Sequence, residues 1–241
     1  MKKVVIFTLI VWCAVASYYV MRPSMKASAK YDHLPNIPRE EVILGQKAGL
    51  ADGAVVFIGD SITEGLPIPP APFPALNAGI NGATAVTYHP FLGKLLDGLK
   101  AKIVIIALGV NDTLSDPRWF FDEYSAICKE VSATGARVVT ATILPVANSS
   151  EHPEYELGSA LVSVATIKQL NSYIAELSER EGYVLLDTHT AFADSTGSLP
   201  SAYTSDGVHL NKAGNEKLKQ FYIDKVSSLH EPITARGIRN P

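Results

Sequence analysis

The chain has 241 residues, of which 47% are hydrophobic and 19% are charged, and this length and composition fit one globular domain with a substantial core. Residues 1–30 carry five basic side chains and no acidic one, so the formal net charge of −3 for the whole chain becomes −8 for the remainder (−3 − 5). An acidic domain has no electrostatic basis for binding nucleic acid or anionic lipid headgroups, and we expect neither as a partner.

The first thirty residues have the pattern of an export signal. Lys2 and Lys3 precede an uncharged run from Val4 to Met21, and further basic residues follow. The small residues Ala14-Val15-Ala16 offer a cleavage site, whereas the run is also close in length to the ~17 residues that can span a bilayer. We therefore predict either a signal peptide or an N-terminal membrane anchor in residues 1–30, the anchor being residues 4–21. In both cases the remaining chain is expected to be exported to the periplasm or the extracellular space.

Strand and helix patterns alternate along residues 54–230. Short apolar runs predict strands over 54–58, 75–78, 103–108, 137–142 and 184–187. Apolar residues spaced three or four apart predict helices over 84–99, 121–131, 164–177 and 218–229. The alternation predicts an α/β domain with parallel strands and helices on both faces of the sheet. Residues 31–53 are expected to be a linker or lead-in with a short helix over 40–47, and residues 231–241 a flexible tail.

A serine stands just past the first predicted strand. Ligands of an open parallel sheet bind at the carboxyl ends of its strands, so Ser61 can meet Asn111, which stands just past the third strand. A serine hydroxyl becomes a nucleophile when a base takes its proton, and we predict this role for Ser61. Asp60-Ser61 also fits a helix N-cap, in which Glu64 would complete a capping box, and the two interpretations are compatible.

The block Asp206-Gly207-Val208-His209 supplies the base. His209 can take the serine proton through one ring nitrogen while Asp206, three residues earlier, accepts a hydrogen bond from the other. On its own the block also fits a simple turn with an exposed histidine. Together with Ser61 it predicts a triad of Ser61, His209 and Asp206.

Two further residues can supply hydrogen-bond donors to an oxyanion. The backbone amide of Gly82 can approach a ligand closely because glycine has no side chain, and Asn111 adds a neutral side-chain donor. With the amide of Ser61 they predict an oxyanion hole of three donors. Taken singly, Gly82 fits an ordinary loop glycine and Asn111 a turn residue. Asp112 is expected to support the turn that presents Asn111.

The other titratable residues indicate no metal site. Cys13 and Cys128 belong to no cluster with zinc-ligand spacing. His189 follows Asp187 and could border the site, but a metal role with Asp187 and Asp194 is disfavoured because no further ligand stands out. The histidines expected to be solvated are His33, His89, His152 and His230. We therefore predict no metal ion at the site.

Four blocks together resemble the SGNH, or GDSL, hydrolase family over about residues 54–228. They are Gly59-Asp60-Ser61-Ile62, Asn77 to Gly82, Gly109-Val110-Asn111-Asp112 and Asp206-Gly207-Val208-His209-Leu210. The resemblance implies a three-layer α/β/α, flavodoxin-like fold with a mostly parallel five-stranded sheet. It also implies cofactor-free hydrolysis of acyl esters or thioesters of lipids, small molecules or O-acetylated sugars. Ala83 departs from the family, many members of which carry an acidic residue at that position.

The sequence thus predicts a serine esterase or acylhydrolase that cleaves short-chain or acetyl esters of small molecules, lipids or carbohydrates. An exported carbohydrate O-acetyltransferase would use the same triad and pass the acyl group to a sugar hydroxyl. A non-catalytic binding module, with Ser61 only as a helix cap, is a third interpretation. The sequence carries no signal for the oligomeric state.

Overall fold

The computed structural model describes residues 38–68, 73–150, 153–155 and 162–230. The expected leader at 1–30, with its apolar run, and the expected tail at 231–241 lie outside these residues. No helix among the described residues is both long enough and apolar enough to cross a bilayer. Residues Arg39–Pro241 group into one compact unit, to which all the elements below belong.

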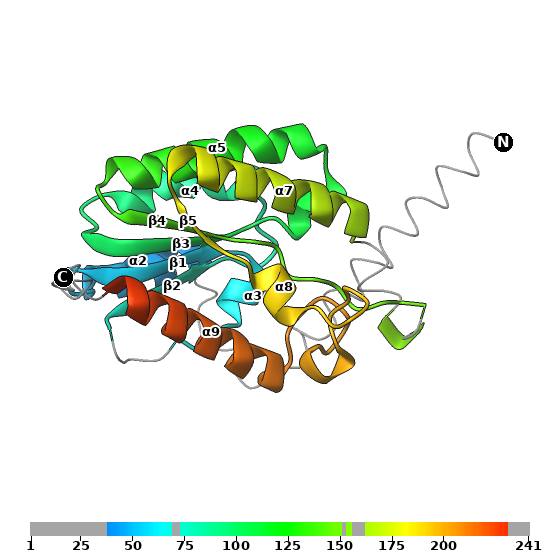
Figure 1. Ribbon diagram of the computed structural model, residues 1–241. Coiled ribbons are helices and arrows are strands. Elements are labelled where there is room, and N and C mark those ends of the chain that lie inside the picture. The colour runs from blue at the N-terminus through cyan, green and yellow to red at the C-terminus, as the bar shows by residue number, and fades with distance from the viewer. Residues whose placement is uncertain (1–37, 69–72, 151–152, 156–161, 231–241) are drawn as a thin grey trace, which may run out of the picture. The chain divides into compact units, whose positions relative to one another are not determined.

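Five parallel strands form one sheet in the order β2-β1-β3-β4-β5 (Figure 1). The strands are β1 (Ala54–Gly59), β2 (Ala75–Gly79), β3 (Ala101–Ala107), β4 (Arg137–Ala141) and β5 (Val184–Leu186). The expected α/β fold with a five-stranded parallel sheet is confirmed, and each strand lies within a residue or two of its predicted bounds.

Helices cover both faces of the sheet, so the domain has three layers (Figure 1). One face carries α2 (Arg39–Ala48), α4 (Ala85–Leu96), α5 (Pro117–Ala133) and α7 (Val164–Glu181). The other face carries α8 (Thr188–Phe192) and α9 (Lys212–His230). The remaining elements are short helical turns, namely α3 (Ser61–Glu64), η1 (Asn111–Leu114), η2 (Pro153–Tyr155) and η3 (Ser201–Tyr203).

Strand β1 is buried on both of its faces. Val56 and Ile58 belong to the core on the side of α4 and α5, whereas Val55 and Phe57 belong to the core on the side of α9. On that second side the rings of Phe57 and Tyr222 meet edge-on, with 5.4 Å between their centroids. Burial on both faces explains why the strand reads as a continuous apolar run instead of an alternating one.

Two helices begin earlier than the apolar spacing predicts. Helix α5 begins at Pro117 because the side chain of Asp116 accepts a backbone N–H of the first turn and proline suits the first helical position. Helix α9 begins at Lys212, and Asn211 Oδ1 accepts the backbone N–H of Gly214 at 3.0 Å. Capping residues are polar, so a pattern of apolar residues does not reveal them.

Helix α2, which lies in the segment expected to be a lead-in, packs on the domain. It lies against β2 and α4, and its Ile43 is fully buried. The guanidinium of Arg39 donates to the carbonyl oxygens of Asn77 and Gly79, both at 2.9 Å, at the end of β2. The chain therefore joins the compact unit at the edge of the sheet where the strands have their carboxyl ends, called the carboxyl edge below.

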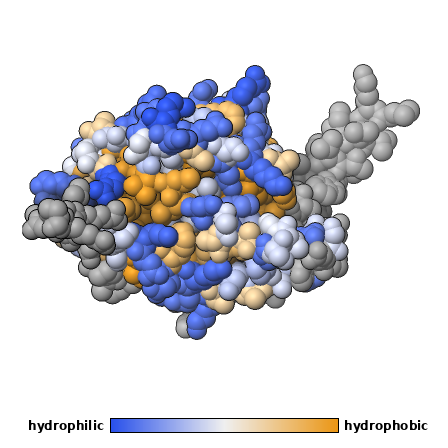
Figure 2. Space-filling model, viewed as in Figure 1, coloured by the Kyte–Doolittle hydropathy of each residue, from blue (hydrophilic) through white to orange (hydrophobic). Residues whose placement is uncertain are grey.

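Strand β5 forms one lateral edge of the sheet. Figure 2 shows a band of apolar residues across this side of the molecule, between the largely polar helices above it and helix α9 below it. Leu185, in the middle of β5, is 38% exposed. With three residues, β5 is too short to offer a long unpaired edge to another chain.

Candidate active site

Strand register brings the ends of three strands together at the carboxyl edge. Gly59, the last residue of β1, pairs with the last residue of β2 and with the last residue of β3. Ser61 follows two residues after Gly59, and the loops after β2 and β3 bear Gly82 and Asn111. The parallel sheet thus brings these three sequence-predicted residues to the same edge.

Ser61 begins helix α3, and Asp60 caps this helix. The Oδ1 atom of Asp60 accepts the backbone N–H of Ile62 at 2.9 Å. Helix α3 packs closely on the end of β2, where a Cβ added to Gly79 would lie 2.3 Å from the backbone nitrogen of Glu64. Such a close approach of two backbones requires glycine, so Gly79 helps to fix the turn that presents Ser61.

The predicted capping box at Glu64 is wrong. Glu64 Oε2 accepts the backbone N–H of Asn81 at 2.6 Å, because the loop after β2 lies within reach of its carboxylate. The side chain of Asn77 adds a second link, donating to the carbonyl oxygen of Thr63 at 2.7 Å. These two side chains tie the turn that bears Ser61 to the loop that bears Gly82.

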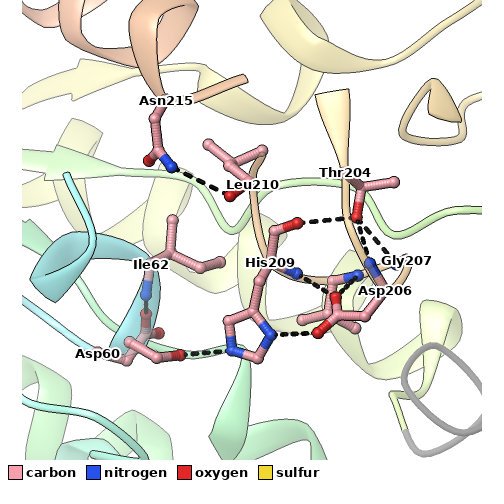
Figure 3. Close-up of polar contacts among 10 residues, drawn as sticks. Asp60, Ile62, Thr204, Asp206, Gly207, His209, Leu210 and Asn215 are labelled. Carbon is pink, nitrogen blue, oxygen red and sulfur yellow. Dashed lines mark hydrogen bonds and ion pairs between the residues drawn. The ribbon is translucent and has the colours of Figure 1, made fainter. Parts of the chain in front are cut away.

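Ser61, His209 and Asp206 form one hydrogen-bonded series. Ser61 Oγ lies 2.9 Å from His209 Nε2, and His209 Nδ1 lies 2.6 Å from Asp206 Oδ2. A carboxylate can only accept, so the proton of the neutral ring sits on Nδ1, which leaves Nε2 free to accept the hydroxyl of Ser61. Figure 3 shows the ring of His209 between the carboxylate of Asp206 and the turn at Asp60.

Asp206 also holds the loop on which it lies. Its Oδ1 accepts the backbone N–H groups of Val208 and His209 at 3.0 and 2.7 Å. One carboxylate thus closes the turn through one oxygen and bonds the imidazole through the other. The turn predicted as an alternative for this block therefore coexists with the contact to the histidine ring.

Three polar residues that were not predicted from the sequence support the same loop, and Figure 3 shows two of them, Thr204 and Asn215. The buried Thr204 donates through Oγ1 to the carbonyl oxygen of His209 and accepts the backbone N–H of Gly207, both at 2.8 Å. Asn211 and Asn215 donate to backbone carbonyls on either side of the loop, at 2.9 to 3.1 Å. Their presence close to the Asp-Gly-x-His block is the signal that could have identified them.

Each of the three predicted oxyanion donors has an N–H bond left to donate to a ligand. Asn111 Nδ2 donates to the carbonyl oxygen of Ala83 at 3.0 Å, which uses one of its two N–H bonds. Among the described residues, no acceptor takes the backbone N–H of Ser61 or that of Gly82. Gly82 has a φ of +73°, a conformation that glycine adopts readily and other residues rarely do.

Asp112 links the turn after β3 to helix α4. Its carboxylate is buried and accepts the backbone N–H of Ala85, at 3.0 and 3.3 Å for the two oxygens. Burial raises the pKa of Asp112 to about 6, although the hydrogen bond from Ala85 lowers it. The support expected from Asp112 thus also reaches the loop of Gly82, three residues before Ala85.

The carboxylate of Asp206 makes His209 a stronger base. Its hydrogen bond raises the pKa of His209, against the opposing effect of burial, and the charges of Asp206 and Asp60 add to the rise. Burial alone would raise the pKa of Asp206, but hydrogen bonds from His209 and Val208 bring it below its ordinary value. The side chains of His209 and Asp206 are 50% and 45% exposed, so solvent reaches the pair.

Asp60 is a buried carboxyl group directly beside the candidate nucleophile. It is 3% exposed and lines a cavity of about 30 Å³ at the ends of β1, β3 and β4, which Ser61 and His209 do not line. Burial raises the pKa of Asp60 to about 7, while a backbone hydrogen bond and the charge of His209 lower it. Asp60 therefore changes charge near neutral pH, close to the ring of His209.

His189, Asp187 and Asp194 serve the loops after β4 and β5. His189 Nδ1 donates to the carbonyl oxygen of Ile143 at 2.9 Å, and Asp187 accepts the hydroxyl of Thr142 at 3.1 Å. Asp194 accepts hydrogen bonds from the turn that follows it. In the part of the chain that the structure describes, no three His, Cys, Asp or Glu side chains are arranged to hold a metal.

The prediction that His89 is solvated is wrong. Its ring lies between α4 and α5, where Nδ1 contacts the carboxylate of Glu123 and Nε2 contacts that of Glu130 at 2.8 Å. Burial lowers the pKa of His89, but the hydrogen bonds to Glu130 and Glu123 outweigh this effect and raise it. Spacing along one helix does not show which residues of the next helix face it.

Solved structures share this fold. A Streptococcus pneumonia protein, named provisionally as a platelet activating factor, is 23% identical with a TM-score of 0.72 over 88% of this chain and 99% of its own. A GDSL-like lipase from Bacteroides thetaiotaomicron is 18% identical with a TM-score of 0.63, over 79% and 98% of the two chains. An acetyl xylan esterase, AlAXEase, is 21% identical with a TM-score of 0.59, over 72% and 99%.

The sequence itself matches a family profile. No curated protein matches the chain significantly. The profile of the GDSL-like Lipase/Acylhydrolase family matches residues 57–217, which is well over half of the chain and includes every block of the candidate site. The chain therefore belongs to the GDSL-like lipase/acylhydrolase family and is a hydrolase that acts on ester bonds.

Proposed function

We propose that the protein is a serine esterase for short acyl esters, acetyl esters above all, with Ser61 as nucleophile, His209 as general base and acid, and Asp206 as the group that orients His209. The observation that supports this proposal most is the unbroken series of hydrogen bonds from Ser61 Oγ through His209 to Asp206 Oδ2. A serine that only capped a helix would not need a base at its hydroxyl.

The reaction proceeds in two steps. His209 Nε2 takes the proton of Ser61 Oγ as the oxygen attacks the acyl carbon, and the N–H groups of Ser61, Gly82 and Asn111 donate to the oxyanion that forms. Collapse of this intermediate breaks the bond to the alcohol, which leaves with the proton from Nε2. Water, deprotonated by His209, then attacks the acyl-enzyme, and the bond between the acyl carbon and Ser61 Oγ breaks as Nε2 returns the proton to Oγ and the acid departs.

Two observations support a short acyl group and transfer to water. The relative AlAXEase is an acetyl xylan esterase, which makes acetyl a natural first choice for the acyl group here. The half-exposed His209 and Asp206 leave solvent close to the acyl-enzyme, which favours hydrolysis over transfer to a sugar hydroxyl.

Incubation with an acetyl ester and oligosaccharide acceptors tests this preference for water. Free acetate is expected, and accumulation of acetylated oligosaccharide would indicate the transferase instead.

We further propose that residues 1–30 direct export and that the compact domain acts outside the cytoplasm. The basic residues Lys2 and Lys3 before the uncharged run Val4–Met21 support this proposal. Protease added to intact cells, or to cells with a permeabilised outer membrane, is expected to digest the domain. Protection until the inner membrane is broken would contradict it.

Labelling by a fluorophosphonate and turnover of an ester panel together test the assignment. Ser61→Ala is expected to lose turnover by on the order of 10⁴-fold or more and to lose labelling, with its unfolding curve unchanged. Asn111→Ala is expected to lose about 10²- to 10³-fold in kcat. Ser228→Ala, an exposed serine near the end of α9, is the control and is expected to keep both properties. Turnover or labelling that survives in Ser61→Ala would refute the assignment.

A further inference from the structure

Large apolar side chains are exposed mainly at the carboxyl edge. Among the described residues, the large apolar side chains with large exposed fractions are those of Val86 (41%), Leu114 (62%), Trp119 (60%), Val164 (51%) and Leu185 (38%). The first four lie at the start of α4, at the end of η1, and at the starts of α5 and α7. Each of these helices follows a parallel strand, so all four residues lie at the carboxyl edge and are called the apolar rim below.

Two segments of the candidate active site lead into the apolar rim. Helix α4 packs against α5, and α5 against α7, and each of the three helices begins at the carboxyl edge. The loop of Gly82 leads into α4, and Asn111 begins the turn that ends at Leu114. The hydrogen bond from Asn111 Nδ2 to the carbonyl oxygen of Ala83 ties these two segments together.

The chain also joins the domain at this edge. Arg39, at the start of α2, donates to the carbonyl oxygens of Asn77 and Gly79 at the end of β2. The 38 residues before it include the uncharged run Val4–Met21, which is of a length that can enter a bilayer. Arg39 is the first residue of the compact unit, so the chain enters this unit at the edge that carries the apolar rim.

The charges at the rim favour an apolar partner. Arg118, next to Trp119, forms an ion pair with Asp116, and the chain after residue 30 has a formal charge of −8 (−3 − 5). Anionic headgroups would be repelled, whereas the interface of a zwitterionic bilayer accepts tryptophan and leucine side chains. Such binding depends on buried apolar area and is expected to be insensitive to salt.

We propose that the apolar rim docks on a zwitterionic bilayer and that the enzyme takes its ester from there, the substrate being a short acyl ester of a membrane lipid. The substrate part of this proposal rests on the proposed esterase function, and the docking part does not. In the docked orientation Ser61, Gly82 and Asn111 face the membrane surface, so the ester bond of a lipid reaches the nucleophile without leaving the headgroup layer.

Fluorescence quenching in the full chain tests the docking. The chain has two tryptophans, Trp12 and Trp119, so Trp12→Phe leaves Trp119 as the only reporter. In phosphatidylcholine vesicles with brominated acyl chains, Trp119 is expected to lose at least half of its emission. The control carries Leu185→Trp together with Trp12→Phe and Trp119→Phe, and its emission is expected to stay unchanged. Absence of quenching at position 119, or equal quenching at position 185, would overturn the proposal. Burial of Trp119 in the absence of vesicles would also overturn it, because that result would mark a contact between copies of the chain.

Activity on two forms of ester tests the substrate. For Leu114→Ser we expect the ratio of the rate on an acetyl ester in vesicles to the rate on a water-soluble acetyl ester to fall about tenfold. For Leu185→Ser, the matched exposed leucine, the ratio is expected to stay the same. An unchanged ratio in Leu114→Ser would overturn the choice of a membrane substrate. Absence of hydrolysis in the unmodified protein would overturn the esterase function, while the quenching result would still decide the docking.

Discussion

The two halves of the candidate site are held in place by different interactions. Ser61 stands at the end of a strand paired on both sides, on a turn packed against the backbone at Gly79. His209 stands on a loop between η3 and α9 that belongs to no strand of the sheet and is held by side chains such as Thr204. We therefore expect substitutions that add atoms to disrupt the first half, and substitutions that remove polar atoms to disrupt the second.

The largest effect is expected from Gly79→Ala. The new Cβ would lie 2.3 Å from the backbone nitrogen of Glu64, so α3 must move away from β2. We expect the free energy of unfolding, measured in urea, to fall by about 3 kcal/mol or more, with loss of turnover. Gly93→Ala, on the exposed side of α4 with open space at its Cβ, is the control and should leave stability equal or slightly higher. Equal stability of both variants would show that the packing at Gly79 does not hold the nucleophile.

A smaller effect is expected from Thr204→Val. The variant leaves the N–H of Gly207 and the carbonyl oxygen of His209 without their partner, at an expected loss of about 1–3 kcal/mol in the free energy of unfolding. The loop is then free to move His209, so kcat should fall while KM stays nearly constant. Thr140→Val removes a hydroxyl that is buried against Ser178, remote from the loop, and should lower stability without lowering kcat. Equal kcat in the two variants would exclude a positioning role for Thr204.

Asp60→Asn tests whether the two halves are coupled electrostatically. The charge of Asp60 raises the pKa of His209, so the neutral amide should lower that pKa and shift the acid limb of kcat/KM to lower pH. Burial raises the pKa of Asp60 itself to about 7, so its charge, and with it the rise in the pKa of His209, develops as the pH passes through neutrality. The exposed Asp52, paired with Lys100, offers the control Asp52→Asn, whose pH profile should not move. A shift to higher pH in Asp60→Asn would contradict the coupling.

The smallest effect is expected at His89, which belongs to neither half. The pKa of His89 is raised in the folded protein, so its contribution to stability is fully present below the ordinary value of 6.5 and is lost as the pH rises through the folded pKa. At low pH the free energy of unfolding of the unmodified protein should exceed that of His89→Gln by on the order of 1 kcal/mol or less, because the carboxylates are partly exposed. At high pH the two free energies should be equal. Urea unfolding across this pH range measures the difference, and a gain confined to high pH would contradict the pairing with Glu123 and Glu130.

The strand-end half was open to prediction because it depends on local patterns. The apolar runs before Gly59 and before Gly109 mark buried strands, and parallel strands end at a common edge, so the sequence alone predicts that Ser61 and Asn111 lie close together. Contacts of long side chains followed no such pattern. Glu64 bonds to Asn81 instead of its own helix, and His89 meets two carboxylates of a neighbouring helix.

The sequence by itself determined the parallel α/β fold, the family and the residues proposed for catalysis, because apolar periodicity and short motifs are properties of neighbouring positions. Only the tertiary structure decided which side chains hold His209 in reach of Ser61, that Asp60 is buried beside them, and that the exposed apolar residues gather at the carboxyl edge. These features depend on how helices and loops far apart in the chain pack in three dimensions, and no spacing along the chain encodes that packing directly.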